Sequence, residues 1–130
     1  MMSGAIEITT GLLQSFTDAW TRHDADEIMS FMTSDCVFES SAGPDVCGTR
    51  YEGPEAVRSG YVAVWTAFPD AHWGNATHFV SGNRGVSEWT FSGTRDDDGK
   101  RVEVHGCDIL TFRDGKIELK NSYRKNRPPF

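Results

Sequence analysis

The stretch GKRVEVHGCDILTFRDGKIELKNSYRK, residues 99–125, carries the pattern that decides the fold of this chain. Apolar and polar residues alternate along two runs, which is typical of strands in a half-buried sheet. Asp114-Gly115 separates the two runs and is a strong pair for a tight hairpin turn. We therefore predict a long strand over residues 101–112, joined by a hairpin to a last strand over residues 116–125.

The segments before this hairpin extend the pattern into a larger sheet. Residues 71–81 and 85–94 both have the composition and alternation of strands, and Gly82-Asn83 between them favours a turn. The DDDGK segment then leads into the long strand through a second turn. Four strands in an antiparallel meander are expected.

Three helices and one short strand precede the meander. The first helix is expected within residues 6–22, where apolar residues form one stripe. The second begins after Asp24, a good N-cap, and is expected to end near Ser34. A short strand over residues 36–40 and a loop follow, and the third helix begins at Pro54. Helices gathered on one face of such a sheet give an α+β fold.

Size and charge limit the possible classes of protein. A chain of 130 residues suffices for one core, so a single domain over residues 1–130 is expected. The net charge is −6, yet basic residues such as Lys120, Arg124, Lys125 and Arg127 gather near the end. No stripe of basic and aromatic residues accompanies them, so they indicate a solvated last strand and tail. No nucleic-acid partner is expected.

Cysteines and hydropathy set further expectations. Cys36, Cys47 and Cys107 are odd in number and form no CxxC pair, so they predict neither a disulfide framework nor a metal site. The start of the sequence lacks the basic and apolar regions of a signal peptide. No apolar segment is long enough to cross a membrane. We expect no membrane partner and a cytoplasmic location.

Several separate segments occur in an order that resembles a known family. They are Trp20 followed by His23-Asp24, then SDCVFE, YEGPEAVRSGY, FPD and GCDILTFRDGKI. Together they resemble the SnoaL-like group of the nuclear-transport-factor-two-like superfamily, over about residues 8–124. The resemblance implies a cone-shaped barrel with three N-terminal helices packed on a strongly curved antiparallel sheet. It also implies a pocket between the sheet and the helices, and a homodimer formed through the sheet face.

Asp108 is the first candidate for a functional residue. It shares one face of its strand with Val104, Leu110 and other residues that are otherwise apolar, and this face should point inward. Burial raises the pKa of a carboxyl group, and a carboxyl that titrates near neutrality can transfer protons. The alternative is a structural Asp108 that binds a backbone group or a tyrosine, since a buried carboxyl needs a partner.

The resemblance adds a comparison with ketosteroid isomerases. Asp108 falls at the position of their protonated, oxyanion-binding Asp, and Tyr61 matches a tyrosine of their hydrogen-bonded network. The position of their catalytic base is Ser40 here, and that of their oxyanion-binding Tyr is Phe16. Serine cannot take a proton from carbon unaided and phenylalanine donates no hydrogen bond, so two of the three essential groups of that mechanism are absent and steroid isomerisation by it is not expected.

Other residues are candidates for lining the pocket. The expected lining residues are Phe16, Trp20, Phe38, Ser40, Trp65, Trp89, Phe91, Leu110 and Tyr123. Glu39 is a possible residue at the pocket mouth. His105 should lie on the opposite face of its strand from Asp108, unless a bulge at Gly106 reverses it.

These observations leave two readings of function open. The first is a cofactor-independent isomerase, cyclase or dehydratase, in which Asp108 and Tyr61 transfer a proton on an apolar, carbonyl-bearing substrate. The second is a non-catalytic module that binds a small apolar ligand or serves dimerisation alone. Many functions share this fold, so the fold does not choose between them.

Overall fold

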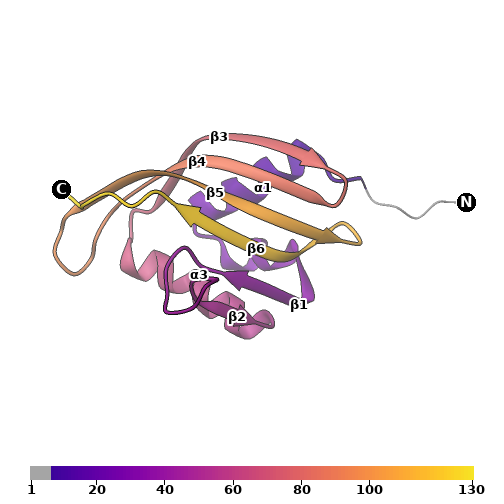
Figure 1. The fold of residues 1–130 in the computed structure, drawn as a ribbon, viewed down its shortest axis with the longest axis horizontal. Helices are drawn as coiled ribbons and strands as arrows, with labels where there is room; N and C mark the ends of the chain where they lie inside the picture. The colour runs from indigo at the N-terminus through magenta and orange to yellow at the C-terminus, as the bar shows by residue number, and fades with distance from the viewer. Residues whose placement is uncertain (1–6) are drawn as a thin grey trace, which may run out of the picture.

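The computed structural model describes residues 7–130, which form a curved sheet with helices packed against one face (Figure 1). The helices are α1 (Thr10–Thr21), α2 (Ala25–Ser30) and α3 (Pro54–Ala67). The strands are β1 (Met32–Glu39), β2 (Arg50–Glu52), β3 (His72–Ser81), β4 (Arg84–Thr94), β5 (Arg101–Arg113) and β6 (Lys116–Arg124). This arrangement confirms the predicted α+β architecture.

The six strands lie in the order β2-β1-β6-β5-β4-β3. The meander from β3 to β6 is antiparallel, as predicted. The sheet as a whole is not purely antiparallel, because β6 also pairs with β1 in parallel. This pairing joins segments far apart in the sequence, so no local turn signal could reveal it. It adds β1 and β2 to the meander on the side where α3 lies (Figure 1).

Local interactions determine where the first elements begin and end. The Asp24 side chain accepts a hydrogen bond from the Glu27 backbone N–H at 3.1 Å, which confirms the predicted N-cap of α2. The helix ends at Ser30, earlier than expected, because the Phe31 carbonyl accepts a bond from the Ile117 N–H at 2.8 Å. The chain therefore joins the sheet at Met32. The short strand β2 lies in a segment expected to be loop.

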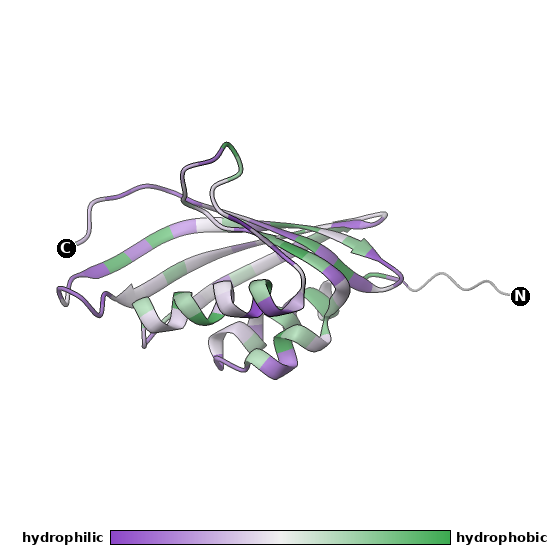
Figure 2. Ribbon diagram, turned by 90° about the horizontal axis from the view of Figure 1, so that it is seen from below, coloured by the Kyte–Doolittle hydropathy of each residue, from purple (hydrophilic) through white to green (hydrophobic). Residues whose placement is uncertain are grey.

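The core lies between the concave face of the sheet and the helices. Figure 2 shows the helices together on that side of the sheet. Among the most completely buried side chains are Tyr61, Phe16, Phe91, Leu13, Ile28 and Leu110. Burying each large apolar side chain contributes roughly 1.5–3 kcal/mol. No helix of residues 7–130 has the length and hydropathy that a membrane crossing requires.

Candidate functional site

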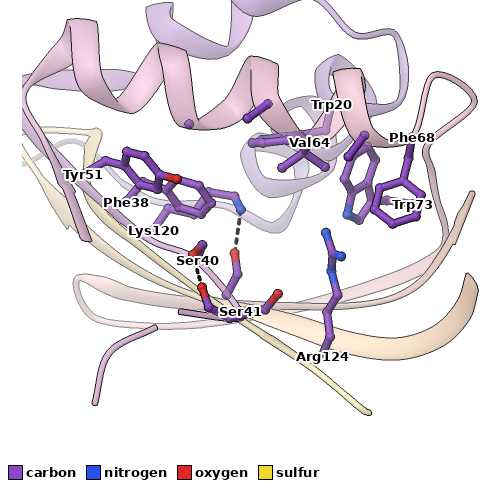
Figure 3. Close-up of a pocket in the computed structure, with 15 residues that line it drawn as sticks. Trp20, Phe38, Ser40, Ser41, Tyr51, Val64, Phe68, Trp73, Lys120 and Arg124 are labelled. Carbon is purple, nitrogen blue, oxygen red and sulfur yellow. Dashed lines mark hydrogen bonds between the residues drawn. The ribbon is translucent and has the colours of Figure 1, made fainter. Parts of the chain in front are cut away.

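A cavity of about 230 Å³ lies between α3 and the inner face of the sheet (Figure 3). Its volume is below the roughly 300 Å³ at which typical drug-sized pockets begin, so it suits a ligand of one or two rings. The lining residues are Trp20, Phe38, Ser40, Ser41, Ala42, Tyr51, Gly60, Ala63, Val64, Ala67, Phe68, Trp73, Lys120, Ser122 and Arg124. The walls are therefore mostly aromatic and aliphatic, while one strand brings two cationic groups.

That strand is β6, which places Lys120, Ser122 and Arg124 along one side of the cavity. The expectation that Lys120 and Arg124 are solvated is therefore wrong. The cause is a bulge: Thr111 pairs with Leu119, whereas Phe112 pairs with Ile117, which leaves Glu118 as an extra residue in β6. Beyond the bulge the inward positions change parity, so counting by two from Ile117 gives the wrong face.

Lys120 is held in the interior by a compact polar cluster. Its Nζ donates to Ser122 Oγ at 2.7 Å and lies 3.1 Å from Asp108 Oδ1. Ser122 Oγ donates in turn to Asp108 Oδ1 at 2.6 Å. Trp89 Nε1 donates to the other carboxylate oxygen, Oδ2, at 3.1 Å. Both oxygens of the Asp108 carboxylate are therefore hydrogen-bonded.

Asp108 faces inward, as the alternation of β5 predicted, and is 6% exposed. It is not an isolated carboxyl, because Lys120, which is 5% exposed, forms an ion pair with it. Lys120 and Ser122 line the cavity and Asp108 does not, so the ammonium is the part of the pair that a ligand would meet. Asp108 was expected to contact a ligand directly. In the structure Lys120 lies at the cavity wall instead, and Asp108 lies behind it.

Aromatic rings surround the Lys120 ammonium. Its Nζ lies 4.5 Å from the centroid of the Trp20 ring and 4.8 Å from that of Phe38. Such contacts stabilise a cation partly removed from water. Burial lowers the pKa of Lys120, and the charge on Asp108 opposes part of that shift. The amine form of Lys120 is therefore more accessible than in a lysine exposed to water.

Arg124 is the second cation at the cavity. Its Cζ atom lies 3.9 Å from the centroid of the Phe91 ring, and its Nε is buried without a hydrogen-bond partner. Burial lowers the pKa of Arg124 to about 10, while the charge on Asp108 acts in the opposite direction. The guanidinium is still protonated at neutral pH, because that pKa lies well above 7.

Tyr61 is completely buried but is not brought together with Asp108. Its hydroxyl donates to the Met32 sulfur, 3.7 Å away, and Tyr61 does not line the cavity. Burial, followed by the charge on Asp108, raises the pKa of Tyr61 well above its ordinary value. The hydroxyl is therefore a neutral structural donor, and the expected assistance of Tyr61 to Asp108 finds no hydrogen bond in this structure.

The predicted lining residues divide into three groups. Trp20, Phe38 and Ser40 lie at the cavity wall. Phe16, Phe91 and Leu110 belong to the core and do not line the cavity. Trp89 also lies beneath the wall, where it binds Asp108, and Trp65 stacks on His23 with their ring centroids 5.2 Å apart.

Three other candidates lie outside the cavity. Tyr123 does not line this cavity and is 51% exposed; it lines an adjoining hollow that shares Ser40, Ser41 and Ser122 with the cavity wall. His105 is exposed on β5, on the face opposite to Asp108, as the alternation indicated. Glu39 pairs with Arg50 at 2.7 Å and does not line the cavity.

Sequence reasoning missed several residues that line the cavity. Lys120, Ser122 and Arg124 share a two-residue spacing, which was a usable signal once their strand parity was known. Tyr51 lies in a segment expected to be loop, so no period pointed to it. Phe68 belongs to the apolar stripe expected on the third helix, which by itself does not separate a lining residue from a core residue. In the described part of the chain, no three His, Cys, Asp or Glu side chains are placed to share a metal ion.

The comparisons with known proteins agree with this architecture. A family model described as SnoaL-like domain matches residues 13–119. No curated protein matches the sequence significantly. Among solved structures, a candidate polyketide cyclase from Xanthomonas campestris pv. campestris is 22% identical, with a TM-score of 0.78 and 89% of each chain covered.

Two further structures resemble this chain. A nuclear-transport-factor-two-like protein of unknown function from Mesorhizobium loti is 25% identical, with a TM-score of 0.70 and 88% of each chain covered. A protein with a ketosteroid isomerase-like fold from Catenulispora acidiphila, solved with trimethylamine, is 15% identical, with a TM-score of 0.75. That match covers 89% of this chain and 86% of the other.

Proposed function

Because this chain belongs to the SnoaL-like domain family, we propose that it is a cofactor-independent enzyme of the isomerase or cyclase type. Its substrate is a small, ring-bearing carbonyl compound that enters the cavity beneath α3. Lys120 transfers the proton, and Asp108 is the positioning residue that holds Lys120 and adjusts its charge. Fold neighbours named as cyclases and isomerases support this reaction class.

One observation carries the proposal: the buried Lys120–Asp108 pair reaches the wall of a ring-lined cavity. Removing two charges from water costs several kcal/mol per ion, and apolar replacements of such pairs are often neutral or stabilising. Stability alone therefore gives little reason to keep this pair. A lysine with a lowered pKa beside a cavity is, in contrast, what proton transfer at carbon requires.

The chemistry follows from the lowered pKa of Lys120. In its amine form, Lys120 is free to take a proton from the carbon next to a substrate carbonyl. The C–H electron pair moves to the carbonyl oxygen, which gives an enolate and an ammonium. In an isomerisation the ammonium returns the proton to another carbon. In a cyclisation the enolate carbon attacks a second carbonyl, and the ammonium protonates the resulting alkoxide.

The first experiment measures exchange of the α-protons of 2-tetralone in D2O by NMR. We expect the wild type to accelerate exchange over buffer and Lys120→Met to lose about 100-fold or more of that acceleration, in the range ascribed to a general base. Asp108→Asn, which keeps the shape but removes the counter-charge, should lose about ten-fold. The matched control is Lys125→Met, because Lys125 is exposed just beyond β6.

Circular dichroism and thermal melting establish that each variant is folded. Exchange by Lys120→Met at the wild-type rate would show that the proton moves elsewhere. Binding of 2-tetralone without accelerated exchange by the wild type would instead favour the non-catalytic binding module.

A further inference from the structure

We propose that the cavity selects a monoanionic ligand, a carboxylate carried on one or two rings, and that Arg124 is the residue that recognises it. This inference rests on the proposed function only in placing the ligand in the same cavity. The anionic substrate class is an addition to the proposed function, because it follows from Arg124 and not from the aromatic walls or the Lys120–Asp108 pair.

The first argument is the balance of charge. Asp108 is the one acidic side chain among the fully buried residues of the described range, and Lys120 already neutralises it. Arg124 adds a further positive charge at the same cavity. Ion pairs of Arg124 with carboxylates are absent from residues 7–130. The cavity therefore carries one unmatched positive charge, which a monoanion would neutralise.

The second argument is the geometry of the guanidinium. Figure 3 shows the Arg124 side chain rising from the sheet into the cavity, near Trp73 and Phe68. The guanidinium lies against the Phe91 ring, and its buried Nε has no hydrogen-bond partner within the described part of the protein. A buried donor without a hydrogen-bonding partner is costly. A carboxylate can bind a guanidinium through two parallel hydrogen bonds and would remove that cost.

The third argument concerns the position of the anion relative to the reacting group. Lys120 lies near Phe38 and Tyr51, whereas Arg124 lies toward the other end of the cavity (Figure 3). Four residues of strand separate their Cα atoms by roughly 13 Å at about 3.3 Å per residue. The carboxylate and the reacting carbonyl should thus stand at opposite ends of the ligand, with the rings between them.

Isothermal titration calorimetry with two matched ligands tests this inference. 2-Naphthoate and 2-naphthamide share their rings and differ in charge. We expect the wild type to bind naphthoate about ten-fold more tightly, and Arg124→Gln to lose that preference while retaining its affinity for the amide. The control is Arg127→Gln, because Arg127 is exposed and bonds only the Glu103 carbonyl and the Phe130 ring.

Equal affinities of the wild type for both ligands, or failure to bind naphthoate at millimolar concentration, would overturn the inference. So would an unchanged preference in Arg124→Gln. If Arg124→Gln does not fold, Arg124→Lys tests the inference in its place, because lysine keeps the positive charge but lacks the planar guanidinium that binds a carboxylate through two hydrogen bonds. We then expect about a three-fold or greater loss of naphthoate affinity, with amide binding unchanged, and no loss would contradict the inference.

The two proposals can fail separately. A preference for naphthoate in a protein that does not accelerate exchange of 2-tetralone would leave the anion site intact and overturn the enzymatic activity. Accelerated exchange of 2-tetralone without a preference for naphthoate would support the enzymatic activity and overturn the anion site.

Discussion

His78 links the sheet to α1 through both nitrogens of its ring. Nδ1 lies 2.8 Å from Ser87 Oγ, and Nε2 lies 2.7 Å from Gln14 Oε1. An amide oxygen can only accept, so we assign the proton to Nε2, and Nδ1 accepts from the serine hydroxyl. Burial lowers the pKa of His78, and the charge of Asp18 on α1 opposes this shift. The neutral ring is therefore part of the folded structure.

A dependence of stability on pH follows from this lowered pKa. As pH falls through about 6.5, the unfolded chain takes up a proton at His78 before the folded protein does. The free energy of unfolding should therefore decrease as pH falls from 7.5 to 5. Thermal melts over this range should show a smaller decrease for His78→Gln, with His72→Gln, an exposed site, as the control.

The carboxylate of Asp35 does not contribute to the change in stability between pH 7.5 and 5. Asp35, whose pKa is lowered to about 2 chiefly by its bond from Arg113, loses its stabilising effect only in more acidic solution. Equal pH dependence in the wild type and His78→Gln would rule out the assigned role of His78.

On β5, one glycine provides the space in which the polar cluster is assembled. A Cβ atom on Gly106 would overlap the Tyr123 carbonyl and lie 2.5 Å from a carbon of the Trp89 ring. The same indole donates to Asp108. The missing side chain thus lets the Trp89 ring approach β5 closely and reach the carboxylate.

We expect Gly106→Ala to destabilise the fold by about 1–3 kcal/mol, the usual cost of overpacking. It should also slow proton exchange, because a displaced Trp89 no longer supports Asp108. Urea denaturation and the exchange assay measure the two effects. Gly11→Ala is the control, since a Cβ there meets only ordinary contacts on α1 and alanine favours a helix. A Gly106→Ala protein as stable and active as the wild type would refute this role.

At the level of elements, alternation predicted the inward face of β5, whereas the faces of β6 cannot be obtained by counting from its first residues. Asp108 could be placed because nothing interrupts β5 between Val102 and Leu110 in its pairing with β4. Lys120 was expected in solvent from the charge pattern, and counting by two from Ile117 would also point it outward, because a single extra residue, Glu118, exchanges the two faces. A bulge depends on pairing with neighbouring strands, so a period within one strand does not reveal it.

At the level of the whole molecule, the sequence predicted the α+β fold from turns, caps and periods, which are all local. The parallel pairing of β1 with β6 was missed, because it depends on how segments far apart in the chain meet. The cavity has the same origin. Its wall combines Trp20 from α1, Tyr51 from β2 and Arg124 from β6, and only the tertiary fold brings these residues together.

The outer face of the sheet carries the last prediction, which is the homodimer implied by the family resemblance. Phe79 on β3 is 56% exposed and Tyr123 on β6 is 51% exposed, although both are large apolar or aromatic side chains. Burying them against a second copy would remove apolar surface from water. We therefore expect light scattering after size exclusion to give twice the chain mass of 14.5 kDa at micromolar concentration.

Tyr123→Glu should shift this equilibrium to the monomer, because each copy would bring a carboxylate to a surface that loses its water on association. The fold should persist, since this side chain lies outside the core. Val62→Glu is the matched control: Val62 is an exposed apolar side chain on α3, on the opposite side of the sheet, and its replacement should leave the mass unchanged. A wild type that stays monomeric up to about 100 µM, or a Tyr123→Glu protein that stays dimeric, would contradict association through this face. In either case the cavity, which lies on the opposite side of the sheet beneath α3, would keep its arrangement of Lys120, Asp108 and Arg124.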